Sequence, residues 1–267
     1  MPWEVVKKYM HQLIVLFVAI CSLLQVSCAN VKTTGQAANV PIETPKVLDD
    51  RSSLVIEHKA YTVSYNENAL LPNWVAYELT EEETDGPWLR RGLRFMPDPD
   101  CDCRQADNND YRHSGYSRGH LAPAGDMKWD SIAMLESFYF TNCFPQDKQL
   151  NNGLWNQLEM KTRALARQYG RVYVACGPVS RPTDTLRMGY HGVVVPSACF
   201  KALLVPDGES YQAIAFMMDN GNETRKLKEC ALSVDELERI LDLDFFFSLP
   251  DKVEEQAESL YDPDFWF

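Results

Sequence analysis

Basic residues are outnumbered in this sequence, and repeats and internal breaks are missing. Among its 267 residues, 26 Lys and Arg stand against 38 Asp and Glu, giving a formal net charge of −12. This excess of acidic residues argues against a protein whose whole surface is basic and binds phosphate groups. No internal repeat is visible, and no Gly- and Ser-rich break divides residues 52–250. With 45% hydrophobic and 11% aromatic residues, disorder is excluded for most of the chain, and a single globular domain is expected.

The charge is unevenly distributed along the chain. Residues 233–267 hold 11 acids and two bases, so this stretch alone carries −9 and the other 232 residues carry only −3. Several bases gather between residues 90 and 128, namely Arg90, Arg91, Arg94, Arg104, Arg112, Arg118 and Lys128. A local basic cleft is therefore expected, and the acidic total does not exclude a polyanionic substrate.

The first 28 residues have the layout of an export signal. Two lysines precede an apolar run over residues 13–24, which is too short to span a bilayer and is typical of a secretory signal peptide. A small residue before Cys28 also allows a lipoprotein signal with a lipid anchor at Cys28, and both forms stay open. Residues 29–51 are polar and aperiodic, which predicts a linker. We expect an exported protein that is secreted, periplasmic or lipid-anchored at the cell envelope.

Six cysteines remain in the expected mature chain besides Cys28. An even number in an exported protein favours disulfides, and the sequence does not choose among the fifteen pairings that six cysteines allow. Cys101 and Cys103 form a Cys-x-Cys pair, but no second pair stands at zinc spacing. A zinc site is therefore disfavoured.

Strands are expected to dominate the fold. Runs rich in β-branched and aromatic residues predict strands at 54–56, 61–65, 75–79, 139–141, 172–175, 193–195, 200–205 and 211–218. Residues 153–168 have helical spacing, and so do residues 234–241, which follow the capping residue Ser233. We expect one domain over residues 52–250 with helices packed on the strands, followed by an acidic and aromatic tail over residues 251–267.

Residues 110–129 are polar and contain Gly, Pro and paired His, which predicts a functional loop. Within it, residues 115–119 (GYSRG) match the Gly-x-Ser-x-Gly elbow of hydrolases, with Asp184 and His191 as triad partners. The elbow requires a buried strand before the serine and a helix after it. The preceding residues are polar, and a nearby Pro and Gly forbid a long helix, so an esterase is disfavoured.

A second pattern in the same loop is more specific. Residues 116–123 (YSRGHLAP) resemble the Asp-Arg-Gly-His signature of the sugar-non-specific DNA/RNA endonucleases, whose active site is a ββα-metal finger. A later block, TNCFPQDKQLNNGLWNQLE at 141–159, places Asn142, Pro145, Gln146, Asn151, Trp155 and Glu159 at the spacings of that family. Weaker similarity extends over about residues 54–250. Ser117 stands where the family usually has Asp, which puts any orienting role of that Asp in doubt.

The resemblance implies an α+β fold with a central antiparallel sheet flanked by helices and a ββα-metal finger near residues 116–168. It also implies metal-dependent cleavage of DNA and RNA to 5′-phosphate ends with little sequence preference. Mg²⁺ is the implied cofactor, with Mn²⁺ or Ca²⁺ as substitutes. A different class remains as the alternative, an exported polyanion-binding protein that has this fold but little or no catalysis. The departure at Ser117 keeps that alternative open, and the oligomeric state is undetermined.

The residue types of the two blocks fit phosphodiester hydrolysis. His120 titrates near neutral pH and is the candidate general base. Asn151 offers an amide oxygen as a direct ligand for Mg²⁺. Glu159 lies eight residues along the same helix, about 12 Å away, and is expected to hold a metal-bound water. Arg118 is expected to clamp a phosphate oxygen beside the base.

Other residues of the blocks have positioning or structural roles. Asn142 is expected to fix the finger or the base by hydrogen bonding. A second phosphate contact is expected from Arg91 or Arg94, between which the sequence does not choose. Trp155 is interpreted as a core anchor. Considered without the rest of the motif, Asn151 would be interpreted as a helix N-cap. A residue at the start of a helix can also face a cleft, so the two roles are compatible.

Overall fold

The computed structural model describes residues 40–181 and 184–267. The predicted signal peptide, the cysteine considered for a lipid anchor and the first residues of the predicted linker lie outside these described residues. Within them, no helix combines the length and the hydrophobicity that crossing a membrane requires.

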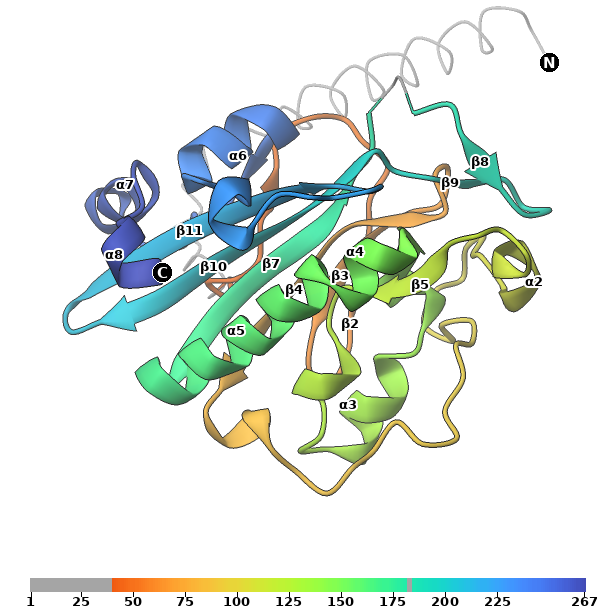
Figure 1. Cartoon of the computed structure of the whole chain (residues 1–267), viewed down its shortest axis with the longest axis horizontal. Coiled ribbons are helices and arrows are strands. Elements are labelled where there is room, and N and C mark those ends of the chain that lie inside the picture. Colours follow the sequence, from red (N-terminus) through yellow and green to blue (C-terminus); the bar gives the residue numbers. More distant parts are fainter. Residues whose placement is uncertain (1–39, 182–183) are drawn as a thin grey trace, which may run out of the picture. The chain divides into compact units, whose positions relative to one another are not determined.

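A seven-stranded sheet forms the centre of the fold (Figure 1). Its strand order is β12-β11-β10-β7-β4-β3-β2, and every neighbouring pair is antiparallel. The strands are β2 (Leu54–Glu57), β3 (Thr62–Asn66), β4 (Leu71–Thr80), β7 (Arg171–Val179), β10 (Ala198–Asp207), β11 (Ser210–Asp219) and β12 (Ala231–Leu232). The predicted central antiparallel sheet is confirmed.

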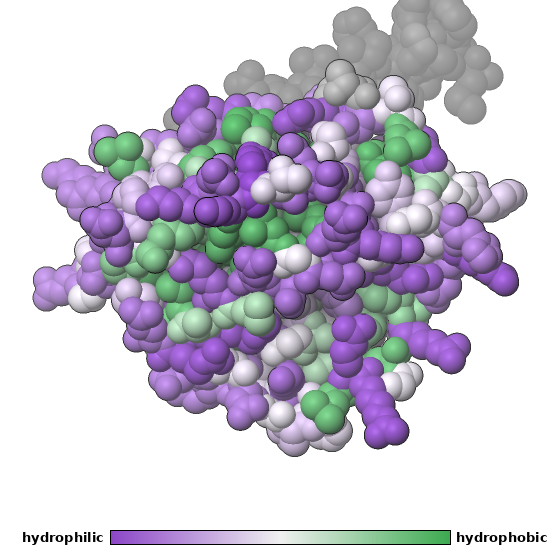
Figure 2. Space-filling model, in the orientation of Figure 1, coloured by the Kyte–Doolittle hydropathy of each residue, from purple (hydrophilic) through white to green (hydrophobic). Residues whose placement is uncertain are grey.

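The middle strands are hydrophobic along their whole length because both faces of the sheet are covered. In β7, Val174 and Cys176 pack into the core on one face, while Tyr173 and Ala175 pack into the core on the other. The sheet therefore separates two hydrophobic cores. Hydrophilic residues, in contrast, cover most of the molecular face seen in Figure 2.

Helices lie on both faces of the sheet (Figure 1). The helix α5 (Leu154–Tyr169) contacts β7 and β10 and buries its apolar side chains in the first core. The helices α6 (Val234–Leu241) and α7 (Asp251–Glu258) contact β11 and bury theirs in the second core. The two predicted helices, residues 153–168 and 234–241, correspond to α5 and α6.

The remaining elements are short. They are β1 (Lys46–Val47), β5 (Ser117–His120), β6 (Cys143–Gln146), β8 (Arg187–Met188), β9 (Val193–Val194), β13 (Leu243–Asp244), α2 (Asn108–Tyr111), α3 (Ser131–Glu136), α4 (Lys148–Asn152) and α8 (Pro263–Trp266). Four 3-10 helices complete the described residues, η1 (Glu82–Thr84), η2 (Ala124–Asp126), η3 (Phe140–Asn142) and η4 (Leu227–Cys230). Residues 139–141, predicted as a strand, belong to the turn of η3, in which Asn142 N–H donates to Tyr139 O at 3.0 Å.

Both ends of the predicted domain continue into ordered structure. One compact unit runs from Val40 to Phe267. Within the predicted linker, β1 pairs with β13 through Lys46 and Val47. The predicted tail forms α7 and α8, and the side chain of Trp266 is 1% exposed. These contacts are between segments that are distant in the sequence, which is why composition alone placed them outside the domain.

The strands β5 and β6 form an antiparallel hairpin that is followed by α4 and α5. His120 pairs with Cys143 in this hairpin, and Ser117 pairs with Gln146. The side chain of Asp147 caps α4 by accepting hydrogen bonds from the N–H groups of Gln149 and Leu150 at 2.8 and 3.1 Å. The hairpin and the helices after it make up the predicted ββα finger.

A glycine separates the two helices of the finger. A Cβ atom at Gly153 would lie 2.6 Å from the backbone oxygen of Gln149, closer than Cβ contacts occur in proteins. Gly153 ends α4, and its backbone angles (φ −103°, ψ −105°) are not helical. The chain can therefore turn at this residue and begin α5 as a separate helix.

The cysteines do not form the expected set of disulfides. Cys101 and Cys103 are bonded to each other, which also removes both thiols from any zinc site. Cys143, Cys176, Cys199 and Cys230 are buried free thiols in the described part of the chain. Burial raises the pKa of Cys143 to about 12 and that of Cys176 to about 11, so both stay protonated at neutral pH. The even count was misleading because these side chains fill the core as small hydrophobic groups.

Candidate active site

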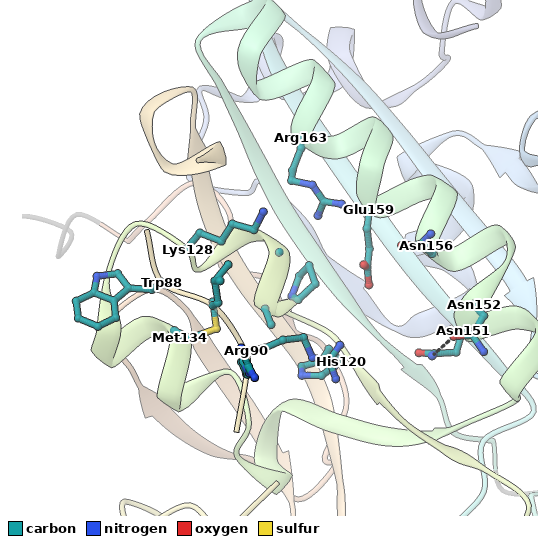
Figure 3. Close-up of a pocket in the computed structure, with 15 residues that line it drawn as sticks. Trp88, Arg90, His120, Lys128, Met134, Asn151, Asn152, Asn156, Glu159 and Arg163 are labelled. Carbon is teal, nitrogen blue, oxygen red and sulfur yellow. Dashed lines mark hydrogen bonds between the residues drawn. The ribbon is translucent and has the colours of Figure 1, made fainter. Parts of the chain in front are cut away.

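A cleft of about 620 Å³ lies between the finger and the loops that precede it (Figure 3). Its lining combines basic and amide side chains with one carboxylate and one imidazole. The lining residues are Trp88, Leu89, Arg90, Arg91, His120, Pro123, Ala124, Gly125, Lys128, Met134, Asn151, Asn152, Asn156, Glu159 and Arg163. Four of the predicted site residues, Arg91, His120, Asn151 and Glu159, thus line one cavity.

One wall of the cleft is a single side of the α4–α5 segment. Asn156, Glu159 and Arg163 follow one another on α5 at intervals of three and four residues, which places their side chains along one helix face. Asn152 stands before the break at Gly153, at the end of α4, and lines the same cleft. The opposite side of α5 buries Leu158 and other apolar residues against the sheet. In Figure 3 the polar side chains of this wall project towards His120.

His120 ends β5, and its imidazole packs among aromatic rings. The ring centroids of Phe95 and Phe138 lie 4.7 and 5.1 Å from that of His120, and Nε2 is buried without a hydrogen-bond partner. Burial, together with the nearby positive charge of Arg90, lowers the pKa of His120 to about 3. The imidazole is consequently neutral at physiological pH, and its pKa is lower than the near-neutral value expected from the sequence.

Glu159 is the carboxylate of the cleft, and its pKa is raised to about 7. Burial is the main cause, and the negative charge of Asp126 adds to it, while the positive charges of Lys201 and Arg163 act in the opposite direction. Arg163 itself pairs with buried Asp126 at 2.6 Å. Glu159 therefore belongs to a buried group of charges, and their combined effect places its pKa near neutral pH.

Lys201 is a buried cation that the sequence analysis did not single out. Its side chain is fully buried, and Nζ has no hydrogen-bond partner. The nitrogen lies 4.9 Å from the ring centroid of Trp155 and 6.0 Å from that of Tyr77. The odd-numbered residues of β10 face the first core. Lys201 therefore points from the sheet towards α5, the helix that forms one wall of the cleft. No local sequence pattern identifies Lys201, because its effect depends on its position next to residues of α5.

Asn151 lies at the last turn of α4, on the cleft. Its Nδ2 donates to Oδ1 of Asn152 at 3.4 Å, and the hydrogen bonds of the described residues leave its own Oδ1 unengaged. An amide oxygen aimed at a cleft with a carboxylate farther along the wall fits a hard divalent cation such as Mg²⁺. The donor set is therefore compatible with the predicted metal.

Asn142 acts on the backbone next to His120 and does not reach the cleft. Its fully buried side chain accepts a hydrogen bond from Ala122 N at 2.9 Å and donates to the carbonyl oxygens of Ala122 and Ser137, both at 2.8 Å. Trp155 is buried as predicted, and its Nε1 donates to the carbonyl oxygen of His120 at 3.3 Å. Both side chains fix the end of β5, which carries the candidate base.

Of the three arginines predicted to contact phosphate, one lines the cleft and two do not. Arg91 lines the cleft together with Arg90, whereas Arg94 is not among the lining residues. Arg118 points elsewhere, since its Nη2 donates to the carbonyl oxygen of Asn108 at 3.1 Å and its guanidinium lies 5.0 Å from the ring centroid of Tyr111. The structure thus brings Arg91 to the cleft that contains the candidate base but does not bring Arg118 there.

Ser117 lies on the side of β5 away from the base. Successive strand residues alternate between faces, so Ser117 and Gly119 share a face, and a Cβ at Gly119 would meet the Gln146 side chain. His120 lies on the other face. The serine at this position therefore does not change the charge that lines the cleft.

The hydrolase triad is not assembled. Ser117 is followed by strand residues of β5 and not by a helix. The Nδ1 of His191 lies 2.9 Å from Oδ2 of Asp110, and the carboxylate of Asp184 accepts hydrogen bonds from Arg181 N and Ser197 N. Each of the three proposed triad members thus has separate partners, which removes the esterase interpretation.

The sequence analysis missed several residues of the cleft. Trp88 forms the rim with its side chain 47% exposed, and Lys128 and Arg90 add positive charge next to it. Arg90 and Lys128 were visible as part of the basic run, but only the fold selects them from the other bases of that run. Asn156 could have been found from the sequence, because it precedes Glu159 by three residues within the predicted helix, a spacing that places both side chains on one helix face.

A β-hairpin and helix that bring a histidine, an asparagine and a glutamate to one basic cleft define a ββα-metal nuclease. The chain belongs to the DNA/RNA non-specific endonuclease family, whose sequence model matches residues 41–252. The resemblance stated from the two sequence blocks is confirmed.

Two curated relatives and one solved structure support this assignment. The chain is 37% identical to the mitochondrial nuclease EXOG of Danio rerio over 72% of this chain and 62% of that protein. It is 32% identical to the mitochondrial endonuclease G of Homo sapiens over 68% of this chain and 65% of that protein. The chain therefore spans less than two thirds of either relative. A crystal structure of an EndoG/EndoGI complex matches with a TM-score of 0.70 and 27% identity, covering 77% of this chain and 90% of that one.

The predicted export is contradicted by this comparison. Both curated relatives are mitochondrial nucleases, not secreted, periplasmic or lipid-anchored proteins. The prediction rested on lysines before a short apolar run in the first 28 residues. That pattern was insufficient because targeting segments for organelles also pair basic residues with apolar ones.

Proposed function

We propose that this protein is a metal-dependent endonuclease that hydrolyses phosphodiester bonds in both DNA and RNA. The observation that carries the proposal is the convergence of His120, Asn151 and Glu159 on one cleft that is rimmed by basic residues. Family membership supports nucleic acid as the substrate class. The described geometry supplies the groups for each part of the reaction.

His120 serves as the general base. Its neutral imidazole takes a proton from the attacking water, and the substrate phosphate, by its negative charge, stabilises the imidazolium that forms. Trp155 Nε1 donates a hydrogen bond to the carbonyl oxygen of His120, which helps to position the backbone of the base. Asn142 has the same positioning role on the following residue.

Asn151 would hold the metal directly through Oδ1, and Glu159 would accept a hydrogen bond from a water of the metal. Mg²⁺ suits such a site because it keeps most of its waters and needs only one or two protein oxygens. When bound, it supplies positive charge to the phosphate and to the leaving oxygen. Mn²⁺ and Ca²⁺, which also prefer oxygen ligands, are the proposed substitutes.

Arg90, Arg91 and Lys128 bind the strand through its phosphates. Their placement on the rim next to the base orients the scissile bond but reads no base edge. This accounts for cleavage of DNA and RNA without sequence preference. Arg118 keeps its proposed role at a phosphate only if its guanidinium leaves Asn108 and Tyr111 when substrate binds.

Degradation of plasmid DNA and total RNA by the purified chain tests the proposal. With Mg²⁺ we expect both polymers to be cut at internal positions to products with 5′-phosphate ends. With EDTA in excess of all divalent cations we expect no cutting. A folded protein that binds both polymers but cuts neither with Mg²⁺, Mn²⁺ or Ca²⁺ would establish the binding-only alternative instead.

The Mg²⁺ requirement is expected to depend on pH through Glu159. Because the pKa of Glu159 is raised to about 7, the carboxyl becomes protonated below that pH and no longer accepts a hydrogen bond from a metal-bound water. The Mg²⁺ concentration for half-maximal activity should therefore rise, by up to about tenfold per pH unit, as the pH falls from about 7 to about 6.

This dependence is measured by titrating Mg²⁺ at a series of pH values. His120 does not contribute over this range, because its pKa lies far lower, at about 3. Glu159→Gln is the control variant, in which the residual activity should have a Mg²⁺ requirement that no longer changes with pH. A requirement that is constant in the unmodified protein would contradict the proposed role of Glu159.

A further inference from the structure

A second group of carboxylates lies outside the cleft, between α6 and α7. Asp235 and Glu238 are three residues apart on α6 and so share a face of that helix, and Glu258 stands at the end of α7. One oxygen from each of the three residues lies within 4.8 Å of the others. None of the three lines the cleft.

Glu258 is buried in this group without a counter-charge. The residue is 3% exposed, and its Oε1 has no hydrogen-bond partner. Further negative charge comes from Asp244 and Glu254, which act electrostatically on Glu258. Among the salt bridges of the described residues, one basic side chain approaches the group, namely Lys46, which lies 3.6 Å from Asp244 and is 57% exposed. An unpaired buried carboxylate is strongly unfavourable unless a cation or a proton compensates it.

Three carboxylates suit Ca²⁺ better than Mg²⁺. Oxygen ligands of Ca²⁺ lie at about 2.3–2.6 Å from the ion, so two of them are at most about 5 Å apart. The three oxygens of this group lie within 4.8 Å of one another and can therefore share one ion. Mg²⁺ is usually held by only one or two carboxylates and keeps several of its waters. Ca²⁺ accepts six to eight oxygens, which leaves places for water beside the three carboxylates.

We propose that Asp235, Glu238 and Glu258 bind a structural Ca²⁺ ion that joins α6 to α7. The ion would neutralise the buried carboxylate of Glu258 and bring the two acidic helices together.

Such an ion would also fix the C-terminal segment against the wall of the cleft. After α7 the chain reaches α8, where the carbonyl oxygen of Trp266 accepts a hydrogen bond from Lys161 Nζ. The ring of Phe265 stacks on Tyr169 with the centroids 5.2 Å apart. Lys161 and Tyr169 belong to α5, the helix that carries Glu159. The proposed site thus ties α8 to the back of the catalytic helix.

Thermal unfolding of the full chain tests the proposal, in EDTA and in about 1 mM Ca²⁺. We expect Ca²⁺ to raise the Tm by about 5 °C. The same shift should occur in the double variant Asn151→Ala, Glu159→Gln, which lacks the proposed metal ligands of the cleft. Glu258→Gln should abolish the shift, because an amide in place of the carboxylate removes a charged ligand of the ion.

Glu255→Gln is the matched control, because Glu255 is an exposed carboxylate on the same helix. It should keep the full Ca²⁺ shift. If Glu258→Gln does not fold, Asp235→Asn replaces it, with equilibrium dialysis of radioactive Ca²⁺ as the readout and the loss of one bound ion per chain as the expected result.

Three results would overturn the proposal. A Ca²⁺ shift that is unchanged in Glu258→Gln or Asp235→Asn, or one that disappears in the cleft double variant alone, would place the ion elsewhere. Absence of any shift in the unmodified protein would mean that a proton, and not an ion, compensates the burial of Glu258.

Discussion

Replacing His120 by alanine is expected to lower kcat/KM for DNA about a thousandfold, the typical contribution of a positioned general base. The loss should fall on kcat, with KM changed only a few-fold, because the imidazole acts on the attacking water and the phosphate is bound by the basic rim. The ring is held between Phe95 and Phe138 and makes no hydrogen bond that stabilises the fold through Nε2. The Tm should therefore change much less than the rate.

His113→Asn is the matched control for this experiment. His113 is an exposed histidine of the same segment, and its backbone has a positive φ of 59°, which asparagine tolerates better than alanine does. This variant should retain activity within about twofold of the unmodified protein. If His120→Ala keeps most of the activity while folded, another group is the base and the proposed mechanism is wrong.

Replacing Asn151 by alanine is expected to reduce activity at least about a hundredfold at low Mg²⁺. The variant removes the only amide oxygen proposed as a direct metal ligand, so part of the loss should be recovered at higher Mg²⁺. The measurement is activity as a function of Mg²⁺ concentration, together with Mg²⁺ binding by calorimetry. An unchanged Mg²⁺ affinity would show that Asn151 is not a ligand.

Asn152→Ala provides the control for the metal assignment. Asn152 is the neighbouring amide, it lines the same cleft, and its Oδ1 accepts the hydrogen bond of Asn151 at 3.4 Å. Its removal should cost a few-fold in activity, because only the orientation of Asn151 is affected. Equal losses in the two variants would indicate that the amides act as a pair and would contradict a single direct ligand.

The sequence alone led to the family, but it did not determine where the arginine side chains end. The motif places Arg118 two residues before His120, hence on the same face of a strand. In the folded protein the long side chain of Arg118 reaches Asn108 and Tyr111 instead, on a segment that the motif does not include. Arg90 and Arg91 take the positions beside the base. The position of the charged end of a flexible side chain depends on residues that are its neighbours only in the folded protein.

The cysteines and the chain ends illustrate the same limit. Counting cysteines and assuming an oxidising compartment predicted several disulfides, whereas four of the thiols fill the core. Composition placed residues 29–51 in a linker and residues 251–267 in a tail. Lys46 and Trp266 nevertheless make contacts with elements far along the chain. These contacts form between segments that are far apart in the sequence, so no local sequence pattern predicts them.

What the sequence determined by itself was everything that rests on periodicity and spacing. Helical spacing predicted the helix over residues 153–168, which carries Trp155 and Glu159, and runs of β-branched and aromatic residues predicted the strands of the central sheet. The strand over residues 117–120 was not predicted, because the polar segment 110–129 is typical of a loop. The tertiary structure decided the electrostatics. The pKa of His120 near 3 comes from aromatic rings and an arginine outside its motif, and the pKa of Glu159 near 7 depends on Lys201 and Asp126 from distant elements. Burial and charge act through space, so the protonation of the site exists only once those elements have packed together.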